Sequence, residues 1–177
     1  MLHIKYHYVN TDKYSSLLTL ININSTKILQ SVLHSAARLI MRKRNFDSIT
    51  PTIRDDLHWL PLPQKIDYKL CMIIYRCLHQ TGTHKSWRYT GAVSTTASRR
   101  HLRSAARGDL QVLATKTVTF GPRSFALSAP KLWNSLPLPL RDSTLTLRQF
   151  GSRLKTHLFS LAYGCASWLI AYKGCAI

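Results

Sequence analysis

The chain has 177 residues, 45% of them hydrophobic, and its 25 Lys and Arg against seven acids give a formal net charge of +18. This length and composition are sufficient for one folded domain, and because all seven acids are aspartates, a carboxylate-rich endonuclease site is not expected. So basic a surface repels itself unless a polyanion screens it. Nucleic acid is the first partner to consider and an anionic membrane surface is the second, while a segment cut from a larger protein that carries the acids elsewhere stays open.

The first strong pattern begins at Thr26, after residues 1–24, whose patterning is weak. Apolar residues then recur at the spacing of one helix face: Leu29, Val32, Leu33, Ala36 and Ile40. We expect this helix to end in residues 42–45, whose cations suit the negative end of the helix dipole.

A short helix is expected over residues 51–57, with Thr50 as its cap and Pro51 at its first position. The next two prolines should stop that turn and open a longer helix over 64–82, ended by Gly82. Its apolar stripe comprises Ile66, Leu70, Ile73, Ile74 and Cys77.

The second half of the chain is less regular. Residues 83–109 are short, polar and basic, which favours a loop, and two β-like runs at 110–113 and 117–120 are compatible with a hairpin. A helix start and a turn are expected over 122–137. Thr146 should cap a last helix over 147–161, whose apolar face carries Leu147, Phe150, Leu154 and Leu158.

These elements predict a mainly α fold: a small helical domain with a short β hairpin or irregular basic segment and loose N- and C-terminal ends. Within it, the stretch "SAPKLWNSLPLPLR" (128–141) is too rich in proline for one long helix and too apolar for a free linker. We expect its prolines to fix a turn that presents Trp133, flanked by Leu132 and Leu136, to the core. A platform for base stacking is the alternative role of this tryptophan.

Four motifs occur in a fixed order: "HWLP" (58–61), "YRCLH" (75–79), "RRHLRS" (99–104) and "LWNSLP" (132–137). With the segments around them, they resemble the region after the polymerase core in LINE-type (non-LTR) retrotransposon reverse transcriptases, and are similar to the chicken-repeat and jockey-like groups. The resembling segments are 29–40, 49–79, 99–110, 120–142 and 147–159.

The resemblance implies a C-terminal-like domain over 25–159, with residues 1–24 and 160–177 as an unmatched N-terminal segment and tail. Residues 80–93 also depart from the family, which usually has an apolar, proline-containing segment there. The family's catalytic parts lie upstream, and no Tyr-x-Asp-Asp turn that could bind two metal ions is present. We therefore expect no enzyme activity and no cofactor.

The candidate nucleic-acid-binding residues lie in a basic segment between Lys85 and Lys131, where nine Lys and Arg face the single acid Asp109, a net of +8. A guanidinium group binds phosphate through two parallel hydrogen bonds, and this contact does not depend on the nucleotide sequence. Small residues around the arginines would let them follow a nucleic-acid backbone, whereas a solvated loop without a partner is the alternative. The candidates are Arg99, Arg100, Arg103, Arg107, Lys116 and Arg123.

Other candidate sites are weaker. Asp55 and Asp56 diverge on a helix, so we expect capping or salt bridging from them and no shared metal. The pairs His3/His7 and His79/His84 have no third ligand, and no Cys-x-x-Cys pair exists, so no metal site is expected. Cys71 and Cys77 are interpreted as core residues.

No secretory signal is visible, and the apolar tail 160–177 is too short and interrupted to span a bilayer. We therefore expect an intracellular protein, nuclear if functional. The expected function is non-catalytic contact with the RNA or DNA backbone at low specificity. The chain would be a truncated element copy. In a longer chain, its partner would be the upstream polymerase domain. The alternatives are a structural segment of a longer polyprotein without binding activity of its own and a peptide that binds membrane surfaces through its tail.

Overall fold

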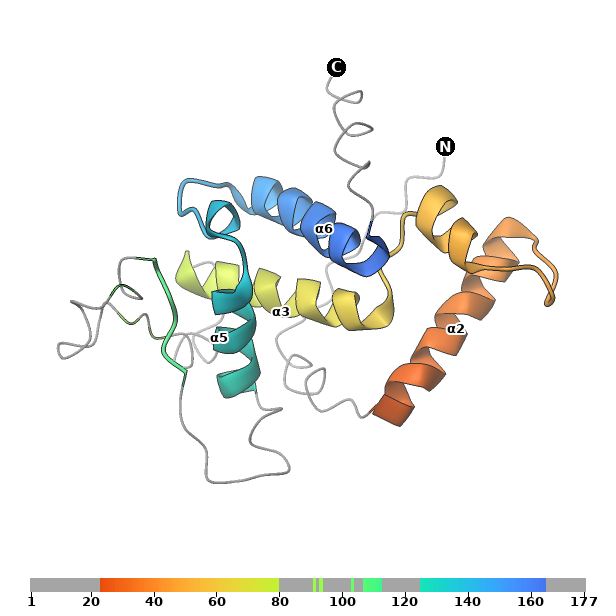
Figure 1. Cartoon of the computed structure of the whole chain (residues 1–177), viewed down its shortest axis with the longest axis horizontal. Helices are drawn as coiled ribbons and strands as arrows, with labels where there is room; N and C mark the ends of the chain where they lie inside the picture. Colours follow the sequence, from red (N-terminus) through yellow and green to blue (C-terminus); the bar gives the residue numbers. More distant parts are fainter. Residues whose placement is uncertain are drawn as a thin grey trace, which may run out of the picture. The chain divides into compact units, whose positions relative to one another are not determined.

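The computed structural model describes residues 23–79, 91, 93, 103, 107–112 and 125–164, and the regular elements among them are helical (Figure 1). The predicted mainly α class is confirmed. Most of the predicted hairpin, residues 113–120, and the end of the predicted third helix at Gly82 lie outside the described residues. The elements are α2 (Ile23–Met41), η2 (Thr52–Asp56), α3 (Leu62–Leu78), α5 (Phe125–Ser135), η6 (Leu138–Leu140) and α6 (Leu147–Tyr163).

The chain divides into two compact units. Of the described residues, 73–134 belong to unit 1, whereas 23–72 and 135–164 belong to unit 2. Helix α3 contributes its first part to unit 2 and its last residues to unit 1.

In unit 2, α2 forms where the periodicity predicts it, but it buries a different face. The buried residue is Ala37, which forms an apolar cluster with Ile49 and Ile53, and the partly buried Leu57 and Trp59 pack against that cluster. Neighbouring residues on a helix point about 100° apart. The buried face, which contains Ala37, is therefore rotated by about that angle around the helix axis from the predicted apolar stripe, which contains Ala36.

The C-terminal end of α2 has an unusual backbone conformation. Arg42 adopts a left-handed conformation, with φ of 52°, although this conformation is costly for any residue with a Cβ. The amide of Arg42 donates to the carbonyl of Leu39 at 3.4 Å, and the amide of Lys43 donates to that of Arg38 at 3.0 Å. This pair of bonds is a Schellman motif, which satisfies carbonyls that the helix end leaves free.

The helix expected over 51–57 is a π-helical turn, η2, and no side-chain hydrogen bond caps it, so Thr50 does not play the predicted role. The amide of Leu57 donates to the carbonyl of Thr52 at 3.0 Å, one residue further back than in an α-helix. His58 then turns left-handed, with φ of 51°, and its Nδ1 lies 3.1 Å from the carbonyl oxygen of Arg54. Because a carbonyl oxygen only accepts, Nδ1 carries the proton.

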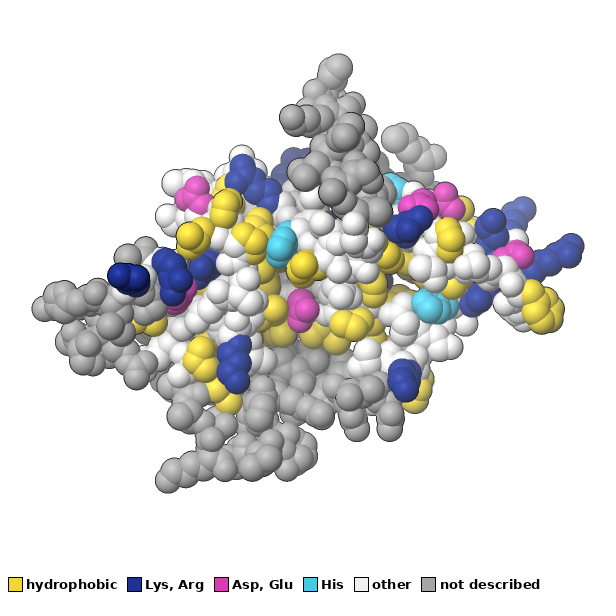
Figure 2. All heavy atoms as spheres, viewed as in Figure 1, with side chains coloured by type: hydrophobic (Ala, Val, Ile, Leu, Met, Phe, Trp, Pro, Cys, Tyr) yellow, Lys and Arg dark blue, Asp and Glu magenta, His cyan; other side chains and the backbone are white. Residues whose placement is uncertain are grey.

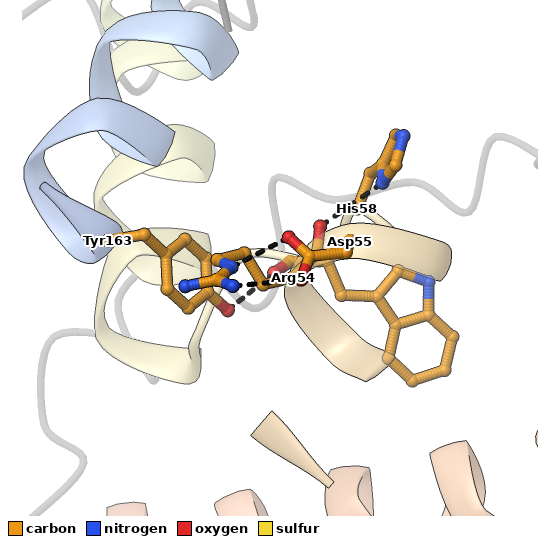
Figure 3. A network of polar contacts seen from close by, with 5 residues as sticks. Arg54, Asp55, His58 and Tyr163 are labelled. Atoms are coloured by element: carbon orange, nitrogen blue, oxygen red, sulfur yellow. Dashed lines mark hydrogen bonds and ion pairs between the residues drawn. The ribbon is translucent and has the colours of Figure 1, made fainter. Parts of the chain in front are cut away.

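A polar cluster joins η2 to the end of α6 (Figure 3). Arg54 donates from Nε and Nη2 to the two carboxylate oxygens of Asp55, at 2.7 and 2.9 Å, and these bonds lower the pKa of Asp55. The hydroxyl of Tyr163 donates to the carbonyl of Trp59 at 3.0 Å. The predicted salt-bridging role is thus confirmed for Asp55, and α6 makes structural contacts beyond the predicted domain boundary at residue 159.

The first part of α3 and helix α6 run antiparallel and side by side (Figure 1). They approach closely at Gly151, where an added Cβ would lie 3.0 Å from the hydroxyl of Tyr68 and 3.4 Å from the sulfur of Met72. The start of α3 is held from α2, because the Gln30 side-chain oxygen accepts a hydrogen bond from the Leu62 amide at 2.8 Å. A long-range side chain therefore satisfies one of the free amides at the start of this helix.

Helix α6 is the element that the sequence predicts best. Thr146 caps it as expected and forms a capping box with Gln149. Gly164 follows its last residue with φ of 66°, a conformation that glycine adopts without steric cost. The predicted apolar face is buried at Phe150, Leu154 and Leu158.

In unit 1, most of the buried side chains come from the last part of α3 and from α5, and Val93 and Leu110 are buried as well. Ile73, Ile74 and Cys77 of the predicted α3 stripe are buried. In α5, Trp133 is buried together with Pro130. The predicted anchoring role of Trp133 is therefore borne out, and its ring is not available for base stacking. The predicted proline-fixed turn around it is wrong, because Trp133 and Pro130 both lie inside helix α5.

Candidate nucleic-acid interface

Two of the six candidate residues, Arg103 and Arg107, lie within the described part of the chain, and both side chains are exposed. The amide of Arg107 donates to the carbonyl of Arg103 at 3.2 Å, the spacing of one helical turn. Residues four apart on a helical turn are neighbours on its surface, so the two guanidinium groups leave the backbone on the same side. Gly108, with φ of 68°, ends the turn.

The segment after this turn is attached to α5 by one side chain. Asn134 accepts a hydrogen bond from the amide of Leu110 at 2.8 Å and donates one to its carbonyl at 2.9 Å. Leu110 is itself buried. A buried backbone amide and carbonyl need partners, and the carboxamide of asparagine supplies both. This pair of bonds fixes the backbone three residues after Arg107.

A second backbone contact holds the same segment. The amide of Val93 donates to the carbonyl of Asp109 at 3.0 Å, and the amide of Gln111 donates to that of Gly91 at 2.8 Å. The two bonds form an isolated antiparallel bridge. The described part of the basic segment is thus an exposed arginine turn on a backbone that is tied down at its C-terminal side.

The electrostatics of this turn are not uniform. Arg107 lies 3.3 Å from the carboxylate of Asp109, whose side chain is only 12% exposed. Arg103 makes no ion pair with a described residue. A phosphate approaching the turn therefore meets the Arg103 guanidinium, which no described acid neutralises, and the Arg107 guanidinium, which Asp109 partly neutralises.

The remaining candidates, Arg99, Arg100, Lys116 and Arg123, lie outside the described residues. The structure thus brings Arg103 and Arg107 together and leaves the other four as predictions from sequence. Lys131, which bounds the basic segment, is exposed on α5. It lies one turn before Asn134 on that helix.

Sequence reasoning missed Asn134 and Gln30, whose carboxamides bind backbone groups distant in the sequence, and the similar contact of the Tyr163 hydroxyl with Trp59. A weak signal was available for Asn134. Asparagine is a poor residue for a helix interior because its side chain competes for backbone hydrogen bonds, yet here it directly follows the buried Trp133. No comparable signal identifies Gln30, because glutamine is common in helices.

The described residues offer little for other chemistry. Burial, with the nearby Asp67 carboxylate as a second cause, raises the pKa of the Cys71 thiol, so this thiol stays protonated and is a poor nucleophile. Within the described ranges, no group of three His, Cys or Asp side chains is arranged to hold a metal ion. None of the helices that the structure describes combines the length and apolar character that crossing a bilayer requires.

Cationic side chains also occur away from the arginine turn. On the face drawn in Figure 2, Lys and Arg side chains are distributed over the described surface with apolar and uncharged groups between them. This distribution is expected from the net charge of +18. Comparison with protein families, curated proteins and solved structures finds no match for this chain.

Proposed function

We propose that the chain is a non-catalytic, nucleic-acid-contacting C-terminal fragment of a retrotransposon reverse transcriptase, in the form of a truncated element copy. The observation that carries the proposal is the exposed pair Arg103 and Arg107 on a backbone that Asn134 attaches to α5. The net charge of +8 over 85–131 supports it, as does the resemblance of the sequence motifs to the region after the polymerase core.

The proposed mechanism is contact with the phosphate backbone. Arginine binds phosphate oxygens through two parallel N–H donors, and such contacts position a protein on nucleic acid without selecting a sequence. Each phosphate that is neutralised releases condensed counterions, so affinity falls steeply with salt. In the longer chain that the resemblance implies, this surface would hold template RNA or target DNA beside the polymerase domain.

The decisive experiment replaces Arg99, Arg100, Arg103 and Arg107 with alanine and measures affinity for duplex DNA over a range of salt concentrations. If each arginine contacts one phosphate, the slope of log K against log salt decreases by about three to four. A matched variant that removes four cations from α2 and its C-terminal end serves as the control, at Lys27, Arg42, Lys43 and Arg44. An equal decrease in both variants would show that binding follows total charge and not the basic segment.

The Arg107–Asp109 pair allows a finer test. Asp109 competes with phosphate for the Arg107 guanidinium, since the two side chains lie 3.3 Å apart. Asp109→Asn should therefore tighten duplex binding at low salt and steepen the salt slope. Unchanged affinity, with the circular dichroism of the parent retained, would remove Arg107 from the interface.

A structural segment of a longer polyprotein, without binding activity of its own, is the second candidate. Exposed apolar side chains on one face of α2 favour it, with Val32 60% and Leu39 81% exposed, because large exposed apolar patches mark surfaces that contact another part of a protein. This candidate predicts no salt-dependent affinity for free RNA or DNA. The titration described above therefore separates the two functions.

A further inference from the structure

The contact between α3 and α6 in unit 2 brings together cations that the sequence analysis did not group. Lys65 and Lys69 lie about 40° apart around the axis of α3, and Arg148 and Lys155 about 20° apart around the axis of α6, at 100° per residue. Tyr68 and Met72 lie beside the two lysines on α3 and face Gly151 of α6. The two cationic rows therefore flank one close helix contact. We call these four residues, Lys65, Lys69, Arg148 and Lys155, the α3–α6 basic seam.

Lys65 and Lys155 are close enough to repel each other. Partial burial lowers the pKa of Lys65, and the positive charge of Lys155 lowers it further. The ammonium group of Lys65 lies 4.8 Å from the centroid of the Trp59 ring, where the negative face of the indole attracts it. Lys65 is thus held beside a like charge, an arrangement that an anion bound between the two would stabilise.

No acid within the described residues neutralises the seam. Helix α6 contains none. Asp67 is the only acid of α3, and it points roughly 160° away from both Lys65 and Lys69. The ion pairs found among the described residues are Arg54–Asp55 and Arg107–Asp109, so none of the four seam residues takes part in one.

The opposite flank of α6 differs. Arg153 lies about 140–160° around the axis from Arg148 and Lys155. Hydrogen bonds from Thr144 lower the pKa of Asp142, and the positive charge of Arg153 lowers it further. An acid, Asp142, is thus close enough to interact with the cation on that flank. Arg153 is exposed and belongs to the same helix, which makes it a matched control for the seam.

The spacing of the seam residues suits a phosphate backbone. Lys65 and Lys69 are separated by a rise of about 6 Å, and Arg148 and Lys155 by about 10.5 Å, at 1.5 Å per residue. One DNA strand advances about 3.4 Å per phosphate along its axis, so the two rows match about two and three nucleotides. Long, exposed side chains can adjust over the remaining difference.

Helix α6, whose residues are all described, has no exposed large hydrophobic side chain on the flank that carries the seam. The exposed large hydrophobic residue nearest to it on α6 is Leu161, which points about 120° away from Lys155. Binding at a membrane surface combines cations with a buried apolar face. A nucleic-acid backbone, which needs only charge and hydrogen bonds, is the better match.

We propose that the α3–α6 basic seam is a second phosphate-contacting surface, which binds the backbone of nucleic acid independently of the basic segment around Arg103. The proposal rests on the proposed function for the choice of nucleic acid as the polyanion. It assigns this contact to the helical core of unit 2.

The test compares two double variants on duplex DNA of mixed sequence. Lys65→Gln with Lys155→Gln should lower the slope of log K against log salt by about 1.8, since each duplex phosphate contact contributes about 0.9. Lys27→Gln with Arg153→Gln removes the same charge outside the seam and should leave the slope close to that of the parent. The charge-preserving pair Lys65→Arg with Lys155→Arg should bind as the parent does.

Folding is checked by circular dichroism. Loss of like-charge repulsion and loss of the attraction between Lys65 and the Trp59 ring act in opposite directions, so the unfolding midpoint of the glutamine variant should stay close to that of the parent. If that variant nevertheless loses its helical signal, the single variants Lys65→Gln and Lys155→Gln replace it, and each should lower the slope by about 0.9.

The other outcomes separate this proposal from the proposed function. Equal slopes in the seam variant and its control overturn the seam, even if the quadruple arginine variant binds weakly. A reduced slope in the seam variant alone supports the seam and removes the basic segment from the interface. Binding to vesicles containing phosphatidylserine that is lost in the seam variant, with duplex binding unchanged, overturns the choice of nucleic acid.

Discussion

Helices α2 and α6 have comparable amphipathic patterns in the sequence, but the apolar face of α6 is buried in the structure and much of that of α2 is exposed. On α6, Phe150 and Leu154 are completely buried. On α2, Leu39 is 81% exposed and Val32 60% exposed, and within residues 25–41 the fully buried side chain is that of Ala37. A periodic pattern indicates that a helix forms and which side is apolar. It does not say whether another element covers that side.

The two helices also end differently. Thr146 and Gln149 form a capping box at the start of α6, and Gly164 ends it in a left-handed conformation. The end of α2 uses the same left-handed geometry with Arg42, which has a Cβ. Local sequence therefore supports α6 at both ends, whereas α2 depends on contacts with η2 and the start of α3, made by Ala37 and Gln30.

The largest effect should come from the buried face of α6. Leu154→Ala should lower the free energy of unfolding by about 2–5 kcal/mol, because it removes apolar contacts and leaves a cavity. Urea denaturation followed by circular dichroism measures the loss. A loss below about 1 kcal/mol would show that α6 is not more tightly packed than α2.

A smaller loss is expected at the start of α6. Thr146→Ala removes the side-chain acceptor of the Gln149 amide and should cost about 1 kcal/mol. Thr146→Ser keeps the hydroxyl and serves as the control. Equal stability of the alanine and serine variants would mean that burial alone holds α6.

At the end of α2 a gain is expected. Arg42→Gly relieves the left-handed strain of a residue with a Cβ and should raise the free energy of unfolding by about 1 kcal/mol. The reciprocal change on α6, Gly164→Ala, should lower it by a similar amount. A stability loss in Arg42→Gly would show that the arginine side chain contributes more than its backbone strain costs.

The smallest effect is expected on the exposed face of α2. Leu39→Gln should change the free energy of unfolding by less than about 0.5 kcal/mol, since the side chain is already in water and glutamine favours helices. The same substitution at Leu154 should be strongly destabilising. If Leu39→Gln destabilises the isolated chain as much, α2 is covered in solution by another surface.

The sequence by itself determined three helices of this protein and several of their ends, but not α5, which contains Pro130 in its interior. Apolar periodicity placed α2, α3 and α6, and the residues around Thr146 identified a cap, because each signal depends on neighbours within a few positions. Composition likewise identified a strongly basic chain and a basic segment that contains Arg103 and Arg107.

Only the tertiary structure decided which faces are covered and which distant groups meet. The carboxamides of Gln30 and Asn134 bind backbone groups 32 and 24 residues away, and the α3–α6 basic seam exists because Gly151 allows two helices to approach. Such contacts depend on how helices pack in three dimensions, which local spacing does not encode. The periodicity of α2 therefore predicted a helix correctly, but the choice of Ala37 as its buried residue required the packing partner.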